Sequence, residues 1–260
     1  MNDDQKQWVY YAIPIAVVVA LGGALYYGKR HKEEAAKPPV AAEAPGSPTT
    51  AQTPEHHPIE APAAAEPLPP LAESDAPLQQ SLQQVFGNAL DRYLVPRDIV
   101  RHFVVTIDNL PRKKTAVQMW PVKPLGGELA TSGADEVTLS AANFDRYESI
   151  VKLATTADTE QLVTLYKRFY PLFQQAYVDL GYPEGYFNNR LIEVIDHLLE
   201  TPEVEGPIKL VQPGVFYEFA DPSLESRSSG QKLLLRMGND NAAAVKLKLR
   251  DIRREIAKRE

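Results

Sequence analysis

The hydrophobic pattern divides the chain into an apolar run near the N-terminus, a proline-rich stretch and a long region with helical periodicity. The apolar run, residues 8–27, contains no charged residue and has aromatic residues near both ends. Twenty helical residues span about 30 Å, the thickness of the hydrocarbon core of a bilayer. The run therefore predicts a single-pass transmembrane helix in the lipid bilayer, preceded by an N-terminal tail over residues 1–7.

A cleaved signal peptide is the alternative interpretation of this run. Signal peptides have a shorter apolar core that follows a basic segment. In this chain Asp3 and Asp4 accompany a single lysine, Lys6, before the run. We therefore expect the anchor to remain attached.

Residues 28–77 have the composition of a linker. The basic patch Lys29-Arg30-His31-Lys32 comes first, and residues 38–77 then hold eleven of the 22 prolines of the chain. Proline removes backbone donors and fixes φ, and the segment has little apolar surface to bury. We expect a disordered Pro/Ala-rich linker that holds a folded domain away from the bilayer.

Apolar residues recur at helical spacing from Leu78 onward, which predicts one multi-helix domain over residues 78–260. The expected helices lie near residues 78–94, 97–109, 140–153, 159–180, 186–200, 229–237 and 239–257. Ser140, Asp158, Ser228 or Ser229, and Asn239 stand at helix starts, where such side chains cap the backbone. The predicted fold class is mainly α.

Three segments depart from this pattern. Pro171 lies inside a strong apolar repeat, where it should kink or restart the helix. Residues 111–138, rich in glycine and proline, are expected to form an ordered loop that buries Trp120. Residues 208–211 and 215–219 give the only strong strand signal and predict a short β-hairpin.

Composition narrows the function classes. The net charge of −6 argues against general nucleic-acid binding, and the absence of cysteine excludes disulfides, zinc-thiolate sites and thiol catalysis. The basic residues after the anchor favour a cytoplasmic domain, but the rule weakens before a long domain, and residues 38–91 contain no lysine or arginine. A domain outside the cytoplasm is slightly favoured.

The strongest polar cluster falls on the helix expected near residues 186–200. It contains Tyr186, Asn188, Asn189, Arg190, Glu193, Asp196 and His197. One interpretation is a pocket that presents Arg190 to a carboxylate or phosphate of a ligand or partner. The other, which we favour, is an internal polar network that fixes this helix against its neighbours.

Other chemistry is weakly indicated. Asp98 with His102, and Glu193 with His197, place an acid and an imidazole one helical turn apart, but local ion pairs explain this spacing better than a metal site. The segment Ser228-Ser229-Gly230-Gln231-Lys232 is better explained as a helix start than as a Ser/Lys pair. We predict no catalytic residue, no metal and no other cofactor.

Five sequence blocks resemble a known family. They are Ile107-Asp108-Asn109-Leu110-Pro111-Arg112, Trp120-Pro121-Val122, Gly185 to Leu191, Ile195 to Leu199, and Gly230 to Gly238. Together they resemble the bacterial domain-of-unknown-function family 3014, over roughly residues 78–257. The resemblance implies a membrane-anchored protein of Gram-negative bacteria, with no assigned activity and no catalytic residues to transfer.

These observations favour a membrane-tethered, non-enzymatic interaction or scaffold domain of the cell envelope. The tether is residues 8–27 in the inner membrane, and the partner is an unidentified envelope protein. The alternative is a small-ligand-binding or enzymatic domain that uses a polar pocket around Tyr186 to His197. The sequence leaves the oligomeric state open.

Overall fold

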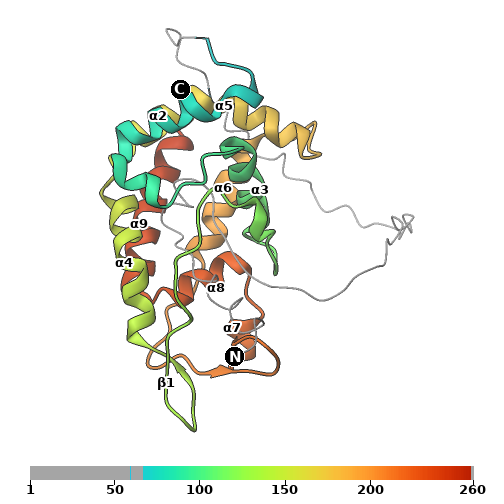
Figure 1. Ribbon diagram of the computed structural model, residues 1–260. Helices are drawn as coiled ribbons and strands as arrows, with labels where there is room; N and C mark the ends of the chain where they lie inside the picture. The colour runs from blue at the N-terminus through green and yellow to red at the C-terminus, as the bar shows by residue number, and fades with distance from the viewer. Residues whose placement is uncertain (1–58, 60–66, 259–260) are drawn as a thin grey trace, which may run out of the picture.

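The computed structural model describes residue 59 and residues 67–258, and this part of the chain forms a mainly helical domain (Figure 1). Its eight α-helices are α2 (Asp75–Phe86), α3 (Ile99–Asn109), α4 (Ala141–Thr156), α5 (Thr159–Asp179), α6 (Phe187–Leu199), α7 (Pro222–Glu225), α8 (Ser229–Arg236) and α9 (Asn239–Ile256). Three short 3-10 helices are η2 (Leu71–Glu73), η3 (Asn88–Arg92) and η4 (Val117–Met119). The strands are β1 (Thr131–Ser132), β2 (Thr138–Leu139), β3 (Leu210–Val211) and β4 (Glu218–Phe219).

The expected transmembrane helix at residues 8–27 lies outside the described residues, as does most of the expected linker. Among the helices that are described, none is both long and apolar enough to cross a membrane. The linker's last residues pack with the domain: Leu71 is buried, and α2 begins at Asp75. Residues 71–77 thus belong to the packed helical region, whereas composition alone predicts a boundary at residue 78.

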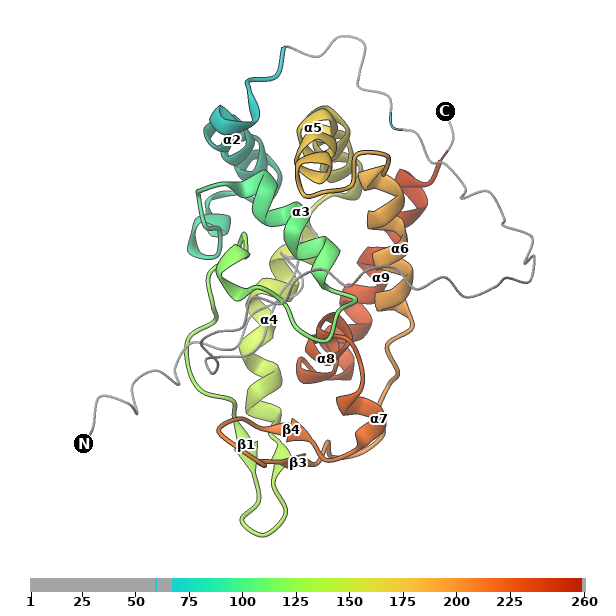
Figure 2. The same cartoon turned by 90° about the vertical axis from the view of Figure 1, so that its right-hand side faces the viewer.

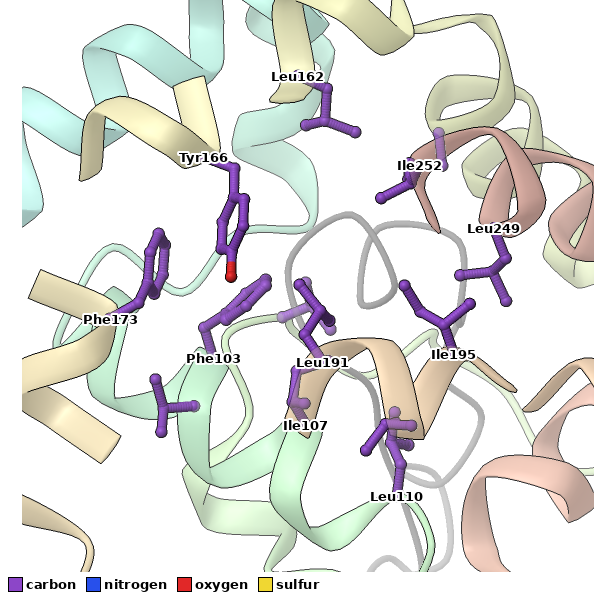
Figure 3. Close-up of a cluster of buried hydrophobic side chains, with 14 of the residues drawn as sticks. Phe103, Ile107, Leu110, Leu162, Tyr166, Phe173, Leu191, Ile195, Leu249 and Ile252 are labelled. Carbon is purple, nitrogen blue, oxygen red and sulfur yellow. The ribbon is translucent and has the colours of Figure 1, made fainter. Parts of the chain in front are cut away.

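The main hydrophobic core lies between α3, α5, α6 and α9. Figure 3 shows their apolar side chains pointing toward one another, with Phe103, Tyr166, Phe173 and Leu191 on one side of the cluster. The rings of Phe103 and Phe173 are 4.9 Å apart between centroids, and Phe173 stacks on Phe187 at 5.9 Å. Aromatic contacts at these distances add to the free energy gained from area burial, so this core fixes how the four helices cross.

The helices form an elongated body with α2 and α5 at one end and the strands at the other (Figure 2). Two antiparallel hairpins, β1–β2 and β3–β4, make up the strand end. They are joined by backbone bonds, since Leu139 N donates to Ile208 O at 2.8 Å and Leu210 N donates to Val137 O at 2.8 Å. A second, smaller apolar cluster beneath them includes Phe219, Leu224 and Leu235.

Most of the expected helices are confirmed, and three of the expected caps are made. Ser140 accepts from Ala142 N, Asp158 from Gln161 N and Ser228 from Gln231 N. Trp120 is also buried, as expected for an ordered loop between α3 and α4. These features follow from local chemistry, and the sequence predicts them for that reason.

The expected helix over residues 78–94 is wrong in its second half. α2 ends at Phe86, because Gly87 adopts φ +68°, and the chain continues as η3. Leu90 and Leu94 are nevertheless buried. The 3-10 segment therefore keeps the apolar side chains on the core side, which is why the spacing resembles one continuous helix.

At Pro171 one of the two expected alternatives is excluded, and one expected cap is wrong. α5 continues as one helix through Pro171 and does not restart there, with Phe169, Leu172 and Phe173 on both sides buried in the core. Asn239 does not cap α9: the cap position is Gly238, and the Asn239 amide donates to Val204 O at 2.9 Å. Gly238 is required there, because it has φ +82° and a Cβ atom would lie 2.7 Å from the Phe144 ring.

The expected hairpin at residues 208–219 is confirmed by β3 and β4. The second hairpin, β1–β2, is missing from the sequence-based prediction. Each of its strands has two residues, as do β3 and β4, but residues 129–139 are mostly small or polar and lack the apolar runs of residues 208–219. Its pairing with residues 208–210 is a tertiary contact, so no local signal marks it.

Candidate functional site

Four of the five family-like sequence blocks contribute residues where the C-terminus of α3, the middle of α6 and the start of α8 come together. We call this region, residues 108–113, 190–197 and 228–231, the junction. Ser229 N donates to Arg112 O at 2.8 Å and Gly230 N donates to Leu110 O at 3.0 Å. A Cβ on Gly230 would lie 2.6 Å from Leu198 Cδ2, so only glycine allows α8 to approach this closely.

A buried carboxylate, Asp108, is the centre of the junction's hydrogen-bond network. Its side chain is 3% exposed and accepts from Arg190 Nε at 3.0 Å. Arg112 forms an ion pair with its other oxygen, and Tyr182 donates its hydroxyl to the same oxygen at 3.3 Å. A buried carboxylate is tolerated only when charge and hydrogen bonds compensate it, and here both oxygens of Asp108 have donors.

The guanidinium group of Arg190 makes several contacts within this network. Besides the Nε contact, its Nη2 donates to the backbone oxygen of Asp108 at 3.0 Å, and its Nη1 pairs with Glu193 at 2.9 Å. Burial by itself lowers the pKa of Arg190, but Glu193 and Asp108 outweigh it, so the net shift is upward. Each of the three guanidinium nitrogens thus makes an internal contact, which fixes Arg190 in this network.

The other sequence-predicted site residues point to different surroundings. Tyr186 is 50% exposed just before α6. Asn188 is fully buried, where it accepts from the Tyr166 hydroxyl at 3.2 Å and donates to Ile256 O at 3.1 Å. Asp196 accepts from Arg253 Nη2 at 2.8 Å, which ties α6 to α9. These candidate residues therefore contact different parts of the fold.

His197 contacts the start of α8. Its Nε2 and Ser228 Oγ form a hydrogen bond of 2.8 Å, and Gln231 Nε2 donates to His197 O at 2.9 Å. Burial lowers the pKa of His197 below its usual value, so the ring is neutral at pH 7. The imidazole thus holds Ser228, the cap residue of α8, against α6.

A serine hydroxyl beside a neutral histidine also has the geometry of a nucleophile and its base. Such a pair needs backbone donors to stabilise an oxyanion. The next three N–H groups are already used: Ser229 N and Gly230 N bond to the α3 terminus, and Gln231 N bonds to Ser228 Oγ at 3.2 Å. The turn after Ser228 therefore offers no oxyanion hole, and its hydroxyl serves as a helix cap.

A pocket of about 470 Å³ lies beside His197, where α6, α7 and α8 meet the chain after α3. Its charged lining residues are Lys113 and Arg227, and Ser223, Ser226 and Ser228 also line it. We call it the basic pocket. The sequence analysis missed both cations, because Lys113 and Arg227 are far apart in sequence and share no periodicity. The only available signal was that each lies next to a family-like block or a predicted cap.

The two acid and histidine pairs noted in the sequence do not form a metal centre. Glu193 pairs with Arg190, and Asp98 with Arg101 at 3.6 Å. Across residues 67–258 there is no group of three or more His, Asp or Glu side chains arranged to hold a metal ion. His102 is buried, with its Nδ1 atom lacking a partner.

Comparison with known families gives one match. The family described as "Protein of unknown function (DUF3014)" matches residues 99–253, a range that includes every element from α3 to most of α9. Searches of curated proteins and of solved structures gave no significant match. The match covers more than half of the chain and contains all parts of the junction, and the chain therefore belongs to the DUF3014 family.

Proposed function

We propose that the helical domain is a non-enzymatic interaction module, which residues 8–27 tether to a membrane of the bacterial cell envelope. The closed hydrogen-bond network around Asp108 is the observation that supports a non-enzymatic role. A catalytic carboxylate or arginine needs an open coordination position for the substrate. Asp108 is 3% exposed and both of its carboxylate oxygens have donors, and each guanidinium nitrogen of Arg190 contacts an internal acceptor.

The tether is supported by the sequence. Residues 8–27 are uncharged and long enough to span a bilayer, and a basic patch follows them. The proline-rich segment up to the start of α2 would give the domain reach to meet a partner.

Photo-crosslinking in membranes of producing cells tests the interaction. A photoreactive residue replaces Tyr186, which is 50% exposed at the start of α6, or Leu247, which is 61% exposed on α9. Exposed aromatic side chains are enriched at binding interfaces, so the Tyr186 position should give a discrete adduct that the Leu247 position does not. A chain that yields no adduct from either position would not be an interaction module.

The contact between Ser228 and His197 favours a second candidate, a hydrolase. It is tested with 4-nitrophenyl acetate and the full chain, comparing Ser228→Ala with the parent. Because the N–H groups after Ser228 are occupied, we expect the same background rate from both proteins. A rate that depends on Ser228 and on His197 would establish the enzymatic alternative instead.

A further inference from the structure

The basic pocket has an unusual charge balance for this protein. The whole chain carries a net charge of −6, yet the pocket's lining includes Lys113 and Arg227 and no aspartate or glutamate. Within the described residues neither of these two cations forms an ion pair. Two uncompensated cations at one concave surface produce a local field that attracts anions.

The nearby carboxylates are occupied elsewhere. Asp108 is bound by Arg112 and Arg190, as described above. Glu225 accepts from Lys232 at 2.6 Å, and Asp221 accepts from the backbone N–H of Ser223 at 2.7 Å to cap α7. These three acids thus have other partners, and Glu200, which acts electrostatically on His197, does not line the pocket.

The polar groups of the pocket are side chains. The first backbone N–H groups of α8 all have acceptors, so the helix terminus adds no donors. A lysine ammonium and an arginine guanidinium bind oxyanions by charge-assisted hydrogen bonds. The Ser226 hydroxyl donates to Ser223 O at 3.1 Å and the Ser228 hydroxyl bonds to His197, so Lys113 and Arg227 are the groups left to hold an anion. His197 closes one wall.

The geometry points to a binding site for a small organic anion, held through its phosphate or carboxylate group by Lys113 and Arg227. The volume of about 470 Å³ falls within the range of small-molecule sites, about 300–1,000 Å³. It leaves room for an organic group against the apolar wall at Pro111. This inference goes beyond the proposed interaction role, because it assigns a ligand class to one surface.

Titration calorimetry on the full chain in neutral detergent tests the site. The probes are phenyl phosphate, benzoate, inorganic phosphate and the uncharged analogue benzyl alcohol. We expect phenyl phosphate to bind with a dissociation constant of about 1 mM or tighter, the scale for a ligand of this size. Benzoate should bind if the carboxylate is the natural group, whereas benzyl alcohol should bind at least about tenfold more weakly than the better anion.

Two variants and a matched control localise the binding. Lys113→Ala and Arg227→Ala should each weaken phenyl phosphate binding by about tenfold, because each removes one charge-assisted contact. Lys114→Ala removes the same charge from the next residue, which does not line the pocket, and should change binding by less than about twofold. Circular dichroism confirms that each variant is folded.

Three results would overturn the inference: no binding of phenyl phosphate or of benzoate at about 10 mM, equal binding of benzyl alcohol and the better anion, or equal losses in Lys113→Ala and Lys114→Ala. The titration contains only the purified chain and the probe. Its failure would therefore leave the crosslinking test of the interaction role unaffected, and a missing crosslink would not affect the titration.

Discussion

Asp108 shows how a single buried charge can organise three segments of this chain. Its carboxylate binds Arg112 of its own helix end, Arg190 of α6 and the Tyr182 hydroxyl. The two arginines differ in burial: the Arg190 side chain is 18% exposed, and that of Arg112 is 54% exposed. Solvent screens the exposed pair and weakens it, so the stability of the junction depends mainly on Arg190.

Replacing Arg190 should therefore cost more than replacing Arg112. We expect Arg190→Ala to lower the free energy of unfolding by about 2–3 kcal/mol, because it leaves a buried carboxylate and a backbone oxygen of Asp108 short of donors. Arg112→Ala should cost less than about 1 kcal/mol. Urea unfolding followed by circular dichroism measures both, and equal losses would show that the network is not buried in solution.

Two histidines, His102 in the core and the half-buried His197, make stability depend on pH. Burial lowers the pKa of His102 and of His197 below the ordinary value of 6.5. As the pH falls through about 6.5, the unfolded chain takes up protons that the folded chain does not. We expect the urea midpoint to be constant above that pH and to fall between about pH 6.5 and 5.5.

The double variant His102→Gln/His197→Gln is the control for this effect. Its urea midpoint should change less over the same pH range, because neither position can then be protonated. Carboxylates titrate mainly below this range. If the double variant loses stability as steeply as the parent chain, the pH dependence arises from other groups.

Among the elements, α8 is the one whose position depends on a glycine, which has no side chain to obstruct close packing. It packs its first turn against the end of α3 and against α6, with Gly230 at the closest approach. We expect Gly230→Ala to destabilise the domain by about 1–3 kcal/mol, because the new methyl group would overlap Leu198 and Leu110.

Gly214 provides a matched control in the β3–β4 hairpin. It has no atom within 4 Å of the position a Cβ would take, and its backbone does not need a positive φ. Gly214→Ala should change thermal stability by less than about 0.5 kcal/mol. A Gly230→Ala protein that melts together with Gly214→Ala would mean that α8 is not closely packed on the junction.

The sequence predicts elements whose signal is local and misses those that tertiary contacts create. The helices around the core were predictable because buried residues such as Phe103, Leu191 and Leu249 recur at helical spacing. The break at Gly87 was not, since the same spacing continues through η3. Hairpin β1–β2 depends on its bonds to residues 208–210, which no local pattern reveals.

The candidate site follows the same rule. Arg190 and His197 stood out, since polar residues on one face of an otherwise apolar helix are visible in the sequence. Their partners were not predictable, because Asp108 and Ser228 come from other helices. These contacts give the two residues different roles. Arg190 belongs to an internal network of the kind that the sequence analysis favours, and His197 borders the basic pocket.

At the scale of the whole molecule, the proposed tether should decide where the protein resides. We expect the full chain to stay in the membrane fraction after washing with alkaline carbonate, which releases peripheral proteins. A chain that starts at residue 31 lacks the apolar run and should be recovered in the soluble fraction. Recovery of the full chain as a soluble protein, cut after the apolar run, would instead support a signal peptide.

The extent of the independently folding unit is the last question at this scale, and two truncations separate the possibilities. A chain that starts at residue 67 keeps η2 and α2. One that starts at residue 78 loses buried Leu71 and also Asp75, whose carboxylate accepts from Asp98 N at 2.7 Å and Ile99 N at 2.8 Å. These two contacts cap the start of α3, which has no cap from its own neighbouring side chain.

Both truncated chains should be predominantly helical, since both keep α3 to α9, which supply most residues of the main core. The shorter one should be less stable by about 2–4 kcal/mol, from the lost helix cap and the lost burial of a leucine. In the longer chain, Asp75→Ala should reproduce about 1–2 kcal/mol of this difference. Equal urea midpoints for the two truncations would show that residues 67–77 add nothing to the fold, and that the folded unit begins at residue 78.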